Sequence, residues 1–144
     1  MRYYKLFLLF IFLFFDCETV DDKLIQTADH EIFVSSKRFL NYRILYPKDF
    51  NNLKKYPLHI FLHGIGERGD DNKLQLTYVD KVFLNPKNHE NYPAIIVFPQ
   101  APLDDSWSSR NLSDNKIKQS FPENSSPTNS LSLVIKLMDS LVNE

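Results

Sequence analysis

The chain is poor in glycine and cysteine, and each shortage excludes a class of structure. Its three glycines, Gly64, Gly66 and Gly69, all fall within one short stretch. Because no glycine follows Gly69, the chain contains no G-x-S-x-G sequence, so it has no nucleophile elbow. The single cysteine, Cys17, excludes an intrachain disulfide.

The chain also lacks a strong excess of either charge. It has 17 Lys and Arg residues against 18 Asp and Glu residues, and its formal net charge is -1. The basic residues are scattered rather than striped, so the sequence predicts no nucleic-acid partner. No set of His, Cys and carboxylate residues has the spacing of metal ligands, and we expect no metal and no other cofactor. The 144 residues allow a single domain.

Residues 1–20 have the pattern of a secretory signal. Arg2 and Lys5 precede an unbroken apolar run from Leu6 to Phe15. Ten residues of helix rise about 15 Å, half of the roughly 30 Å hydrocarbon core, so this run is too short to span a bilayer. We therefore expect a protein that is secreted or held in the cell envelope, at the periplasm or the outer surface. It would meet a membrane only through this signal or a lipid anchor.

Cys17 leaves the processing of this segment open. It stands where a bacterial lipoprotein carries its acylated cysteine, but Asp16 before it is larger than the residue usual at that position. The alternatives are an incidental thiol near a cleavage site and an uncleaved anchor. Residues 21–30 are polar and acidic, which predicts a short tether before the folded domain, residues 31–144.

The first strands predicted are residues 31–35 and 39–46, joined in an antiparallel hairpin. In the second, apolar and aromatic side chains alternate with Asn41 and Arg43, which is typical of a half-buried strand. The runs 58–62 and 94–98 are almost continuously apolar, as in parallel strands covered on both faces.

Helices are predicted between and after the two parallel strands. Leu76, Val79 and Phe83 have the spacing of a crossover helix, which would begin near Asp70 or Asp71. The result is a βαβ unit. A last amphipathic helix follows Pro127, with one apolar face: Leu131, Val134, Leu137, Met138 and Leu141.

The glycines follow the first parallel strand in the sequence LHGIGERGDD, residues 62–71. Glycine is needed where backbone is left-handed or approaches another group closely, so a strand ending in this loop builds a backbone feature. Residues 64–69 match the G-x-G-x-x-G of dinucleotide sites, but the next strand ends in Pro99-Gln100 without the carboxylate that would bind ribose. Glu67 would also oppose a pyrophosphate. A glycine-rich turn without chemistry is the other alternative.

The loop, together with YPAIIVFPQAP (residues 92–102) and Trp107, resembles the α/β-hydrolase superfamily. Within it, the chain is most similar to the secreted peptidase and carboxylesterase group, relatives of the phospholipase/carboxylesterases. The resemblance runs from about Phe39 to the C-terminus. It implies the N-terminal portion of an α/β-hydrolase sheet, truncated before the nucleophile elbow.

The resemblance also implies roles for residues of the loop. In such enzymes the residue after His-Gly offers its backbone N–H to the oxyanion, which is Ile65 here, and Gly66 keeps the turn open beside it. His63, Gly64 and Trp107 would face the substrate, although Trp107 could equally be packing at the sheet edge. The family's nucleophilic serine, acid and catalytic histidine have no counterparts in this chain.

The leading functional hypothesis is therefore the N-terminal part of a secreted serine hydrolase that acts on an ester or peptide by acyl transfer. Residues 1–144 alone would be inactive, because they supply the oxyanion loop without a nucleophile. The alternative is a non-catalytic, degenerate hydrolase module that acts as a surface or binding domain.

Overall fold

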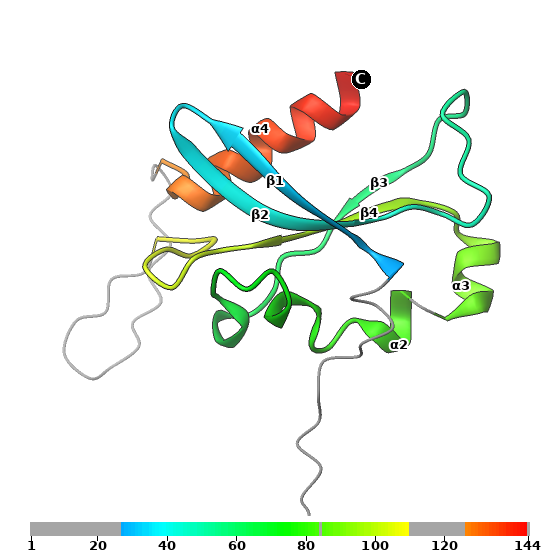
Figure 1. Ribbon diagram of the computed structural model, residues 1–144, viewed down its shortest axis with the longest axis horizontal. Coiled ribbons are helices and arrows are strands. Elements are labelled where there is room, and N and C mark those ends of the chain that lie inside the picture. The colour runs from blue at the N-terminus through cyan, green and yellow to red at the C-terminus, as the bar shows by residue number, and fades with distance from the viewer. Residues whose placement is uncertain (1–26, 84, 110–125, 144) are drawn as a thin grey trace, which may run out of the picture.

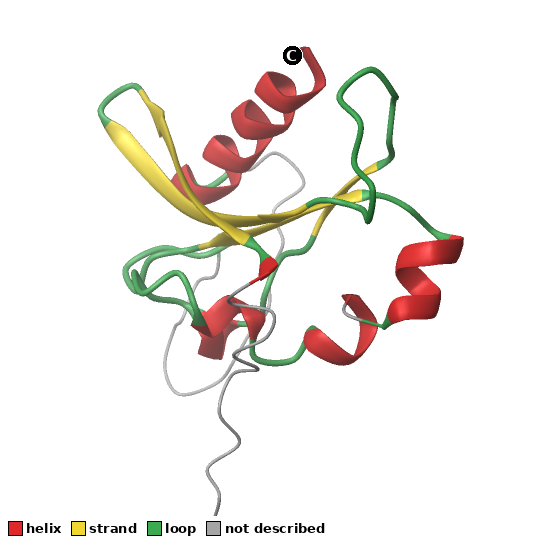
Figure 2. Ribbon diagram, turned by 45° about the vertical axis from the view of Figure 1, so that its right-hand side comes forward, coloured by secondary structure: helices red, strands yellow, loops and turns green. Residues whose placement is uncertain are grey.

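A four-stranded sheet forms the centre of the protein. The computed structural model describes residues 27–83, 85–109 and 126–143, and the strands lie in the order β1-β2-β4-β3. Figures 1 and 2 show helix α4 on one face of the sheet and the helical segments between β3 and β4 on the other. This is the α/β architecture that the sequence predicts. The bounds are Asp29–Ser35 for β1, Arg38–Leu45 for β2, Leu58–Ile60 for β3, Ile95–Gln100 for β4 and Asn129–Asn143 for α4.

Strands β1 and β2 form the predicted antiparallel hairpin. The two residues between them, Ser36 and Lys37, both have left-handed backbone, with φ of 53° and 66°. Two consecutive left-handed residues are typical of a type I′ turn, whose twist matches that of the paired strands. Strand β1 begins at Asp29, opposite Ile44, so the end of the predicted tether (residues 21–30) belongs to the sheet.

Both faces of β2 are buried toward its end, although its alternating pattern predicts one exposed face. Leu40 is buried, as the half-buried pattern predicts, and it packs with residues of α4. On the opposite face Arg43 and Leu45 are also buried. The Arg43 side chain donates from Nε to the carbonyl oxygen of Asn72 at 2.9 Å and from Nη1 to that of Ala28 at 3.1 Å. These carbonyl groups satisfy its donors, which allows a charged residue to be buried.

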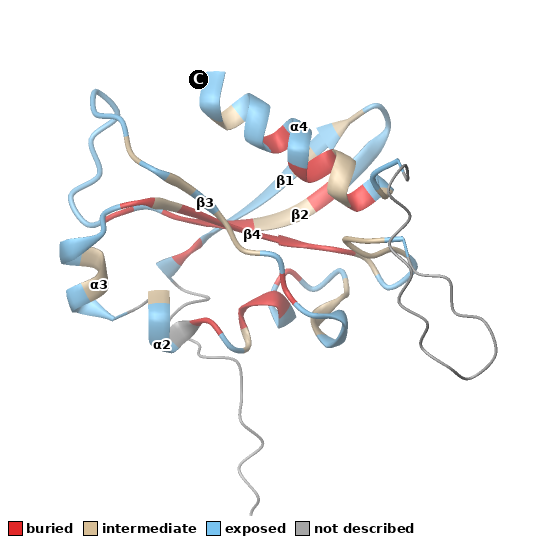
Figure 3. Cartoon of the chain, turned by 180° about the vertical axis from the view of Figure 1, so that it is seen from behind, coloured by how far each residue is buried: buried red, intermediate tan, exposed pale blue. Residues whose placement is uncertain are grey.

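Strands β3 and β4 are parallel, as predicted, with Leu58 opposite Ile95 and Ile60 opposite Val97. Figure 3 shows β4 buried along most of its length, which is typical of a central strand. Strand β3 is shorter than predicted and exposes His59. Among the described residues, no strand pairs with its outer edge.

The segment between β3 and β4 is not the single helix that the spacing of its apolar residues predicts. It contains two 3₁₀ turns and two short helices, which are η1 (Ile65–Glu67), η2 (Leu74–Leu76), α2 (Asp80–Phe83) and α3 (Pro86–Asn91). Pro86 begins α3, and Asn85 before it is extended, with ψ of 120°. A residue before proline avoids helical backbone, so a helix cannot continue through this point. The predicted apolar side chains nevertheless share one cluster with the sheet.

Helix α4 begins two residues after Pro127 and packs on the sheet through a face that differs in part from the predicted one. Val134 and Leu137 are buried as predicted, but Met138 is 39% exposed and Leu133 is buried instead. Apolar residues extend around more than one side of this helix, so the sequence leaves its rotation open. The surface of the sheet decides which side is covered.

The predicted signal and Cys17 lie outside the described residues. None of the helices that the structure describes is long and apolar enough to cross a bilayer.

The hairpin turn provides a test of the fold. Because a left-handed conformation costs a non-glycine residue roughly 1 kcal/mol or more, we expect Lys37→Gly to raise the stability of the protein. The gain should be about 0.5–1 kcal/mol after the greater entropy loss of glycine, measured as a shift of the urea midpoint. Lys55→Gly is the matched control, since Lys55 is exposed and its φ is not positive; this change should not stabilise. Equal effects of the two substitutions would contradict the turn geometry.

Candidate active site

The three glycines lie in the loop that leaves β3, at the edge of the sheet where the parallel strands end. The turn η1 is at its centre, where the N–H of Glu67 donates to the carbonyl oxygen of Gly64 at 3.4 Å. Within the part of the chain that the structure describes, the N–H groups of Ile65 and Gly66 donate to no acceptor. This turn therefore offers two adjacent backbone donors.

Glycine can be required by a left-handed backbone or by the close approach of another group. In this loop the reason is close approach. None of the three has a positive φ. A Cβ atom on Gly69 would lie 3.2 Å from Nε2 of Gln100, closer than most real contacts. A Cβ atom on Gly66 would meet nothing within 4 Å, so this side of the turn is open to an approaching molecule. The left-handed residue of this region is Asn72, with φ of 51°.

His63 fixes the start of the loop. Its side chain is buried, and its Nε2 accepts the N–H of Ala101, just beyond β4, at 3.0 Å. The ring proton is therefore on Nδ1, which donates to the carbonyl oxygen of Gly64 at 2.6 Å. Both ring nitrogens are used by backbone groups. His63 therefore joins the loop to the end of β4 and has no nitrogen left to serve as a base.

The environment of His63 keeps its ring neutral. Burial lowers the pKa of His63 below its ordinary value of 6.5, and the charge of Arg68 acts in the same direction. The hydrogen bond to Gly64 and the charge of Glu67 oppose this effect without reversing it. A protonated ring would turn Nε2 into a donor facing the N–H of Ala101, so protonation would break the link to β4.

Trp107 packs beside the loop and also lines a cavity there. Its indole N–H donates to the carbonyl oxygen of His63 at 2.9 Å, and the two rings meet edge to face at 5.0 Å. It also packs against the apolar cluster under α4. The same residue lines a small cavity of about 80 Å³ beside the loop. The cavity is lined by His63, Gly64, Ile65, Arg68, Ala101, Ser106, Trp107 and Ser108.

Gln100, the last residue of β4, holds the far end of the loop. Its buried side chain donates from Nε2 to the carbonyl oxygen of Glu67 at 3.2 Å and to Oδ1 of Asp71 at 2.8 Å. Its Oε1 accepts the N–H of Asn72 at 2.7 Å. Sequence reasoning missed this role, because it considered Gln100 only as a position without a carboxylate. An amide at the end of a buried strand, facing a glycine loop, is the signal that could have revealed it.

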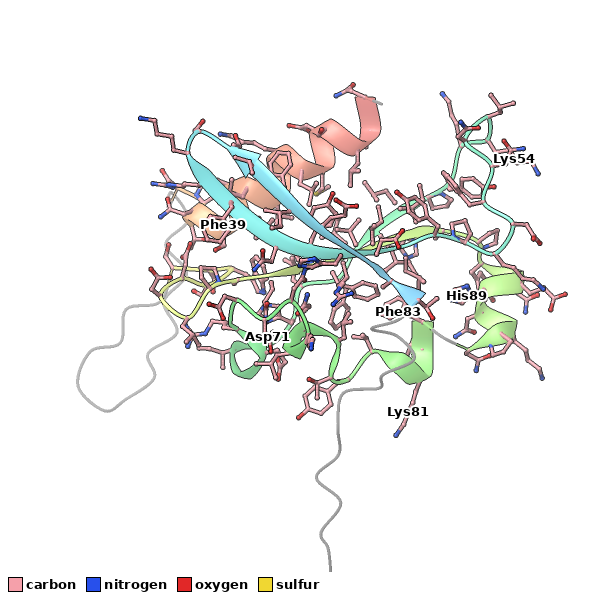
Figure 4. The ribbon with its side chains drawn as sticks, viewed as in Figure 1. Phe39, Lys54, Asp71, Lys81, Phe83 and His89 are labelled. Carbon is pink, nitrogen blue, oxygen red and sulfur yellow. The ribbon has the colours of Figure 1, made fainter. Side chains whose placement is uncertain are left out.

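Asp71 and Asn72 complete this polar network; Figure 4 labels Asp71. The Oδ1 atom of Asp71 accepts the N–H groups of Lys73 and Leu74 at 2.9 and 3.1 Å. These bonds hold the backbone just before η2, which begins at Leu74, a few residues after the helix start that the sequence predicts. Burial raises the pKa of Asp71, but its hydrogen bonds from Gln100 and these N–H groups outweigh this effect and lower the pKa below 3.8.

Asn72 has every polar group of its backbone and side chain engaged. Besides its bonds to Gln100 and Arg43, its Nδ2 donates to the carbonyl oxygen of Tyr42 at 3.0 Å, and its Oδ1 accepts a hydrogen bond from Gln75. The residue is 1% exposed. It therefore connects the loop to both β2 and β4.

Arg68 joins the loop to the segment before α4. Its Nε donates to the carbonyl oxygen of Ile65 at 3.0 Å, and its Nη1 donates to those of Leu103 and Asp105 at 2.8 and 3.2 Å. The carboxylate of Asp105 in turn accepts the N–H and the hydroxyl of Ser130 at the start of α4. The position of η1 is thereby tied to that of α4.

The described part of the site has donors but no nucleophile and base in contact. Ser106 lines the cavity, but its hydroxyl donates to the carbonyl oxygen of Ser108 at 2.7 Å, and the nitrogens of His63 are occupied. No group of three His, Cys, Asp or Glu residues among those described could hold a metal ion. The arrangement can polarise a bound carbonyl group.

The pKa of His63 predicts how stability depends on pH. The imidazole of His63 takes up a proton near pH 6.5 in the unfolded chain and only at lower pH in the folded one. The contribution of the neutral ring to the free energy of unfolding is therefore fully present above pH 6.5 and is lost as the pH decreases below that value. We expect the urea midpoint of the wild-type chain to decrease as the pH is lowered from about 7.5 to about 5. His63→Gln, which can still accept from Ala101 and does not titrate, should remove this part of the dependence. His59→Gln, at an exposed position on β3, should retain it. Identical profiles for all three proteins would contradict the buried neutral ring.

No family model matches the chain. A search of curated proteins finds no similar sequence. Among solved structures, the chain is similar to one described as the crystal structure of a thermostable esterase, with a TM-score of 0.68 and 31% sequence identity. The match covers 84% of this chain and 32% of the esterase chain, so the chain spans about a third of the length of that relative. The chain thus has a hydrolase-like α/β fold of the kind found in an esterase.

Proposed function

We propose that this chain supplies the oxyanion loop of a secreted or envelope-attached serine hydrolase of the carboxylesterase or peptidase type. In this proposal Ile65 provides the backbone donor, and Gly66 leaves the approach to it open. Trp107, Gly64 and the ring face of His63 form the wall that meets the substrate. The observation that carries the proposal is the pair of unused N–H groups at Ile65 and Gly66 beside the cavity.

The rigidity of the loop supports this role. An oxyanion donor is effective when it is held in position before the reaction, because no reorganisation is then needed as charge develops. Three side chains hold the loop by hydrogen bonds to its backbone carbonyl groups. His63 holds its start, Arg68 holds its centre, and Gln100 holds its far end. The similarity to an esterase supports the same class of chemistry.

The proposed reaction is acyl transfer through a serine that this chain does not supply. The serine hydroxyl attacks the carbonyl carbon of an ester or amide, and its proton passes to a histidine base. The carbonyl oxygen then becomes negative and accepts a hydrogen bond from the N–H of Ile65. When the tetrahedral intermediate collapses, the C–O or C–N bond of the substrate breaks, the leaving alcohol or amine takes the proton from the histidine, and the acyl group stays on the serine until water releases it. A second donor would come from the residue after the nucleophile, as in other hydrolases of this kind.

The alternative is a non-catalytic module with the same fold. It is favoured by one observation, which is that the histidine nearest the cavity has both nitrogens occupied and forms no pair with Ser106. The coding DNA beyond codon 144 separates the two proposals. An in-frame G-x-S-x-G within a few tens of codons supports the hydrolase, and a stop codon supports the module.

The oxyanion assignment predicts a matched pair of variants in the protein that carries both this chain and the nucleophile. Ile65→Pro removes the N–H and should lower kcat about 10² to 10³-fold. Ile65→Ala keeps the N–H and should retain kcat within about tenfold, since Ile65 is 52% exposed. The measurement is hydrolysis of p-nitrophenyl acetate, with the urea midpoint of each variant as a check on folding. A folded Ile65→Pro protein with full activity would contradict the assignment.

A further inference from the structure

The cavity beside the glycine loop has backbone acceptors that are already used and a backbone donor that is not. Five carbonyl oxygens of its lining residues accept hydrogen bonds within the protein. They belong to His63, Gly64, Ile65, Ala101 and Ser108. The N–H of Ile65, by contrast, donates to no acceptor that the structure describes. The cavity therefore suits a ligand group that accepts hydrogen bonds.

Arg68 adds further donors at the junction of the two walls of this cavity. One wall is the start of the loop, and the other is the segment after β4. Nε of Arg68 donates to Ile65 in the first wall. Nη1 donates to Leu103 and Asp105, just before the second wall resumes at Ser106. In the planar guanidinium Nη2 shares one edge with each of these nitrogens, and it donates to no described group.

The positive charge of Arg68 has no counter-ion in the described part of the chain. Carbonyl groups accept its hydrogen bonds but carry no charge, and it forms no salt bridge with a described carboxylate. Among the described residues that line the cavity, Arg68 alone is charged, because the ring of His63 is neutral. The side chain is half-buried, and a partly desolvated charge gains most from a partner of opposite charge.

One carboxylate lies close to the loop without lining the cavity. Oε2 of Glu67 is 2.7 Å from the position that a Cβ atom on Gly64 would occupy, so this carboxylate lies against Gly64. Glu67 is not one of the lining residues and does not pair with Arg68. Its charge repels an anion bound at Arg68, so removing the charge of Glu67 should strengthen anion binding.

Unused donors, occupied acceptors and an unpaired cation fit a group that is negatively charged and only accepts hydrogen bonds. A carboxylate is such a group, and it matches the guanidinium of arginine in charge and geometry. We propose that this cavity binds a carboxylate of the substrate through Nη2 of Arg68. The cavity, of about 80 Å³, holds a group of only a few atoms.

The proposal names a substrate class for the proposed hydrolase, and in that respect it rests on the proposed function. The preferred substrates are esters or peptides in which a free carboxylate lies a few atoms from the scissile carbonyl group. The oxyanion donor at Ile65 lines the same cavity as Arg68, so one substrate would engage both.

Trp107 reports on binding, because it is the only tryptophan of the chain and lines the cavity. The two ligands are monomethyl succinate, which carries a carboxylate, and dimethyl succinate, in which a second ester replaces it. At neutral pH the carboxylate is ionised, and monomethyl succinate should change the emission of Trp107 saturably. Its dissociation constant should be at least about tenfold below that of dimethyl succinate. This titration of the full chain needs no nucleophile.

Three variants identify the group that binds the carboxylate. Arg68→Gln should abolish the preference for monomethyl succinate. Glu67→Gln should tighten the binding of monomethyl succinate roughly two- to fivefold and leave that of dimethyl succinate unchanged. Lys54→Gln is the control for net charge, since Lys54 is exposed in the loop that enters β3, away from the glycine loop (Figure 4); it should change neither.

Two results would overturn the proposal. The first is equal binding of the two succinates to the wild-type chain, and the second is an unchanged preference in an Arg68→Gln chain whose urea midpoint shows that it folds. If Arg68→Gln does not fold, Glu67→Gln decides, because unaltered binding of monomethyl succinate in that variant contradicts an anion at Arg68.

Hydrolysis separates this proposal from the proposed function. In the protein that carries both this chain and the nucleophile, kcat/KM is compared for p-nitrophenyl hemisuccinate and its neutral methyl ester. Arg68→Gln should lower the ratio of the two values at least about tenfold. A purely structural role of Arg68 would lower both values together and leave the ratio unchanged, which would overturn the proposal. Binding of monomethyl succinate without hydrolysis of either ester would support the anion site and contradict the hydrolase alone.

Discussion

The loop of the candidate site depends on one buried amide, the side chain of Gln100 at the end of β4. Its nitrogen holds Glu67 and Asp71, and its oxygen holds Asn72. Gly69 leaves room for this amide, because a Cβ atom there would lie 3.2 Å from its nitrogen, closer than most real contacts. A buried amide has a strong preference to be fully hydrogen-bonded, so the loop conformation and the position of Gln100 determine each other.

The remaining contacts of the loop extend this constraint to the rest of the fold. Asn72 connects it to β2 through Tyr42 and Arg43, and Arg68 connects it to the start of α4 through Asp105. The candidate oxyanion donors therefore lie on a segment fixed from several elements. This is the arrangement that preorganised electrostatic stabilisation requires, although Ser106 and His63 beside the cavity are not in contact as a nucleophile and base would be.

One face of β2 shows how burial depends on neighbouring segments. Along β2, Arg43 is buried and Phe39 is exposed, the reverse of what their chemistry suggests. Arg43 lies beneath the loop, where carbonyl groups accept its hydrogen bonds. Phe39 lies nearer the hairpin turn, where it is 66% exposed. The loop thus explains how a charged residue is buried in β2.

The sequence by itself determined the order and type of the main elements, because strand and helix periodicity and proline positions are local properties. The hairpin, the parallel pair, the last helix and the placement of the glycine loop after β3 could all be predicted. Only the tertiary structure decided that the crossover segment divides into short turns and helices, that α4 buries Leu133 in place of Met138, and that His63 and Gln100 hold the loop. These features depend on contacts between residues far apart in the chain. Local pattern carries no information on which distant carbonyl or N–H group will face a given side chain.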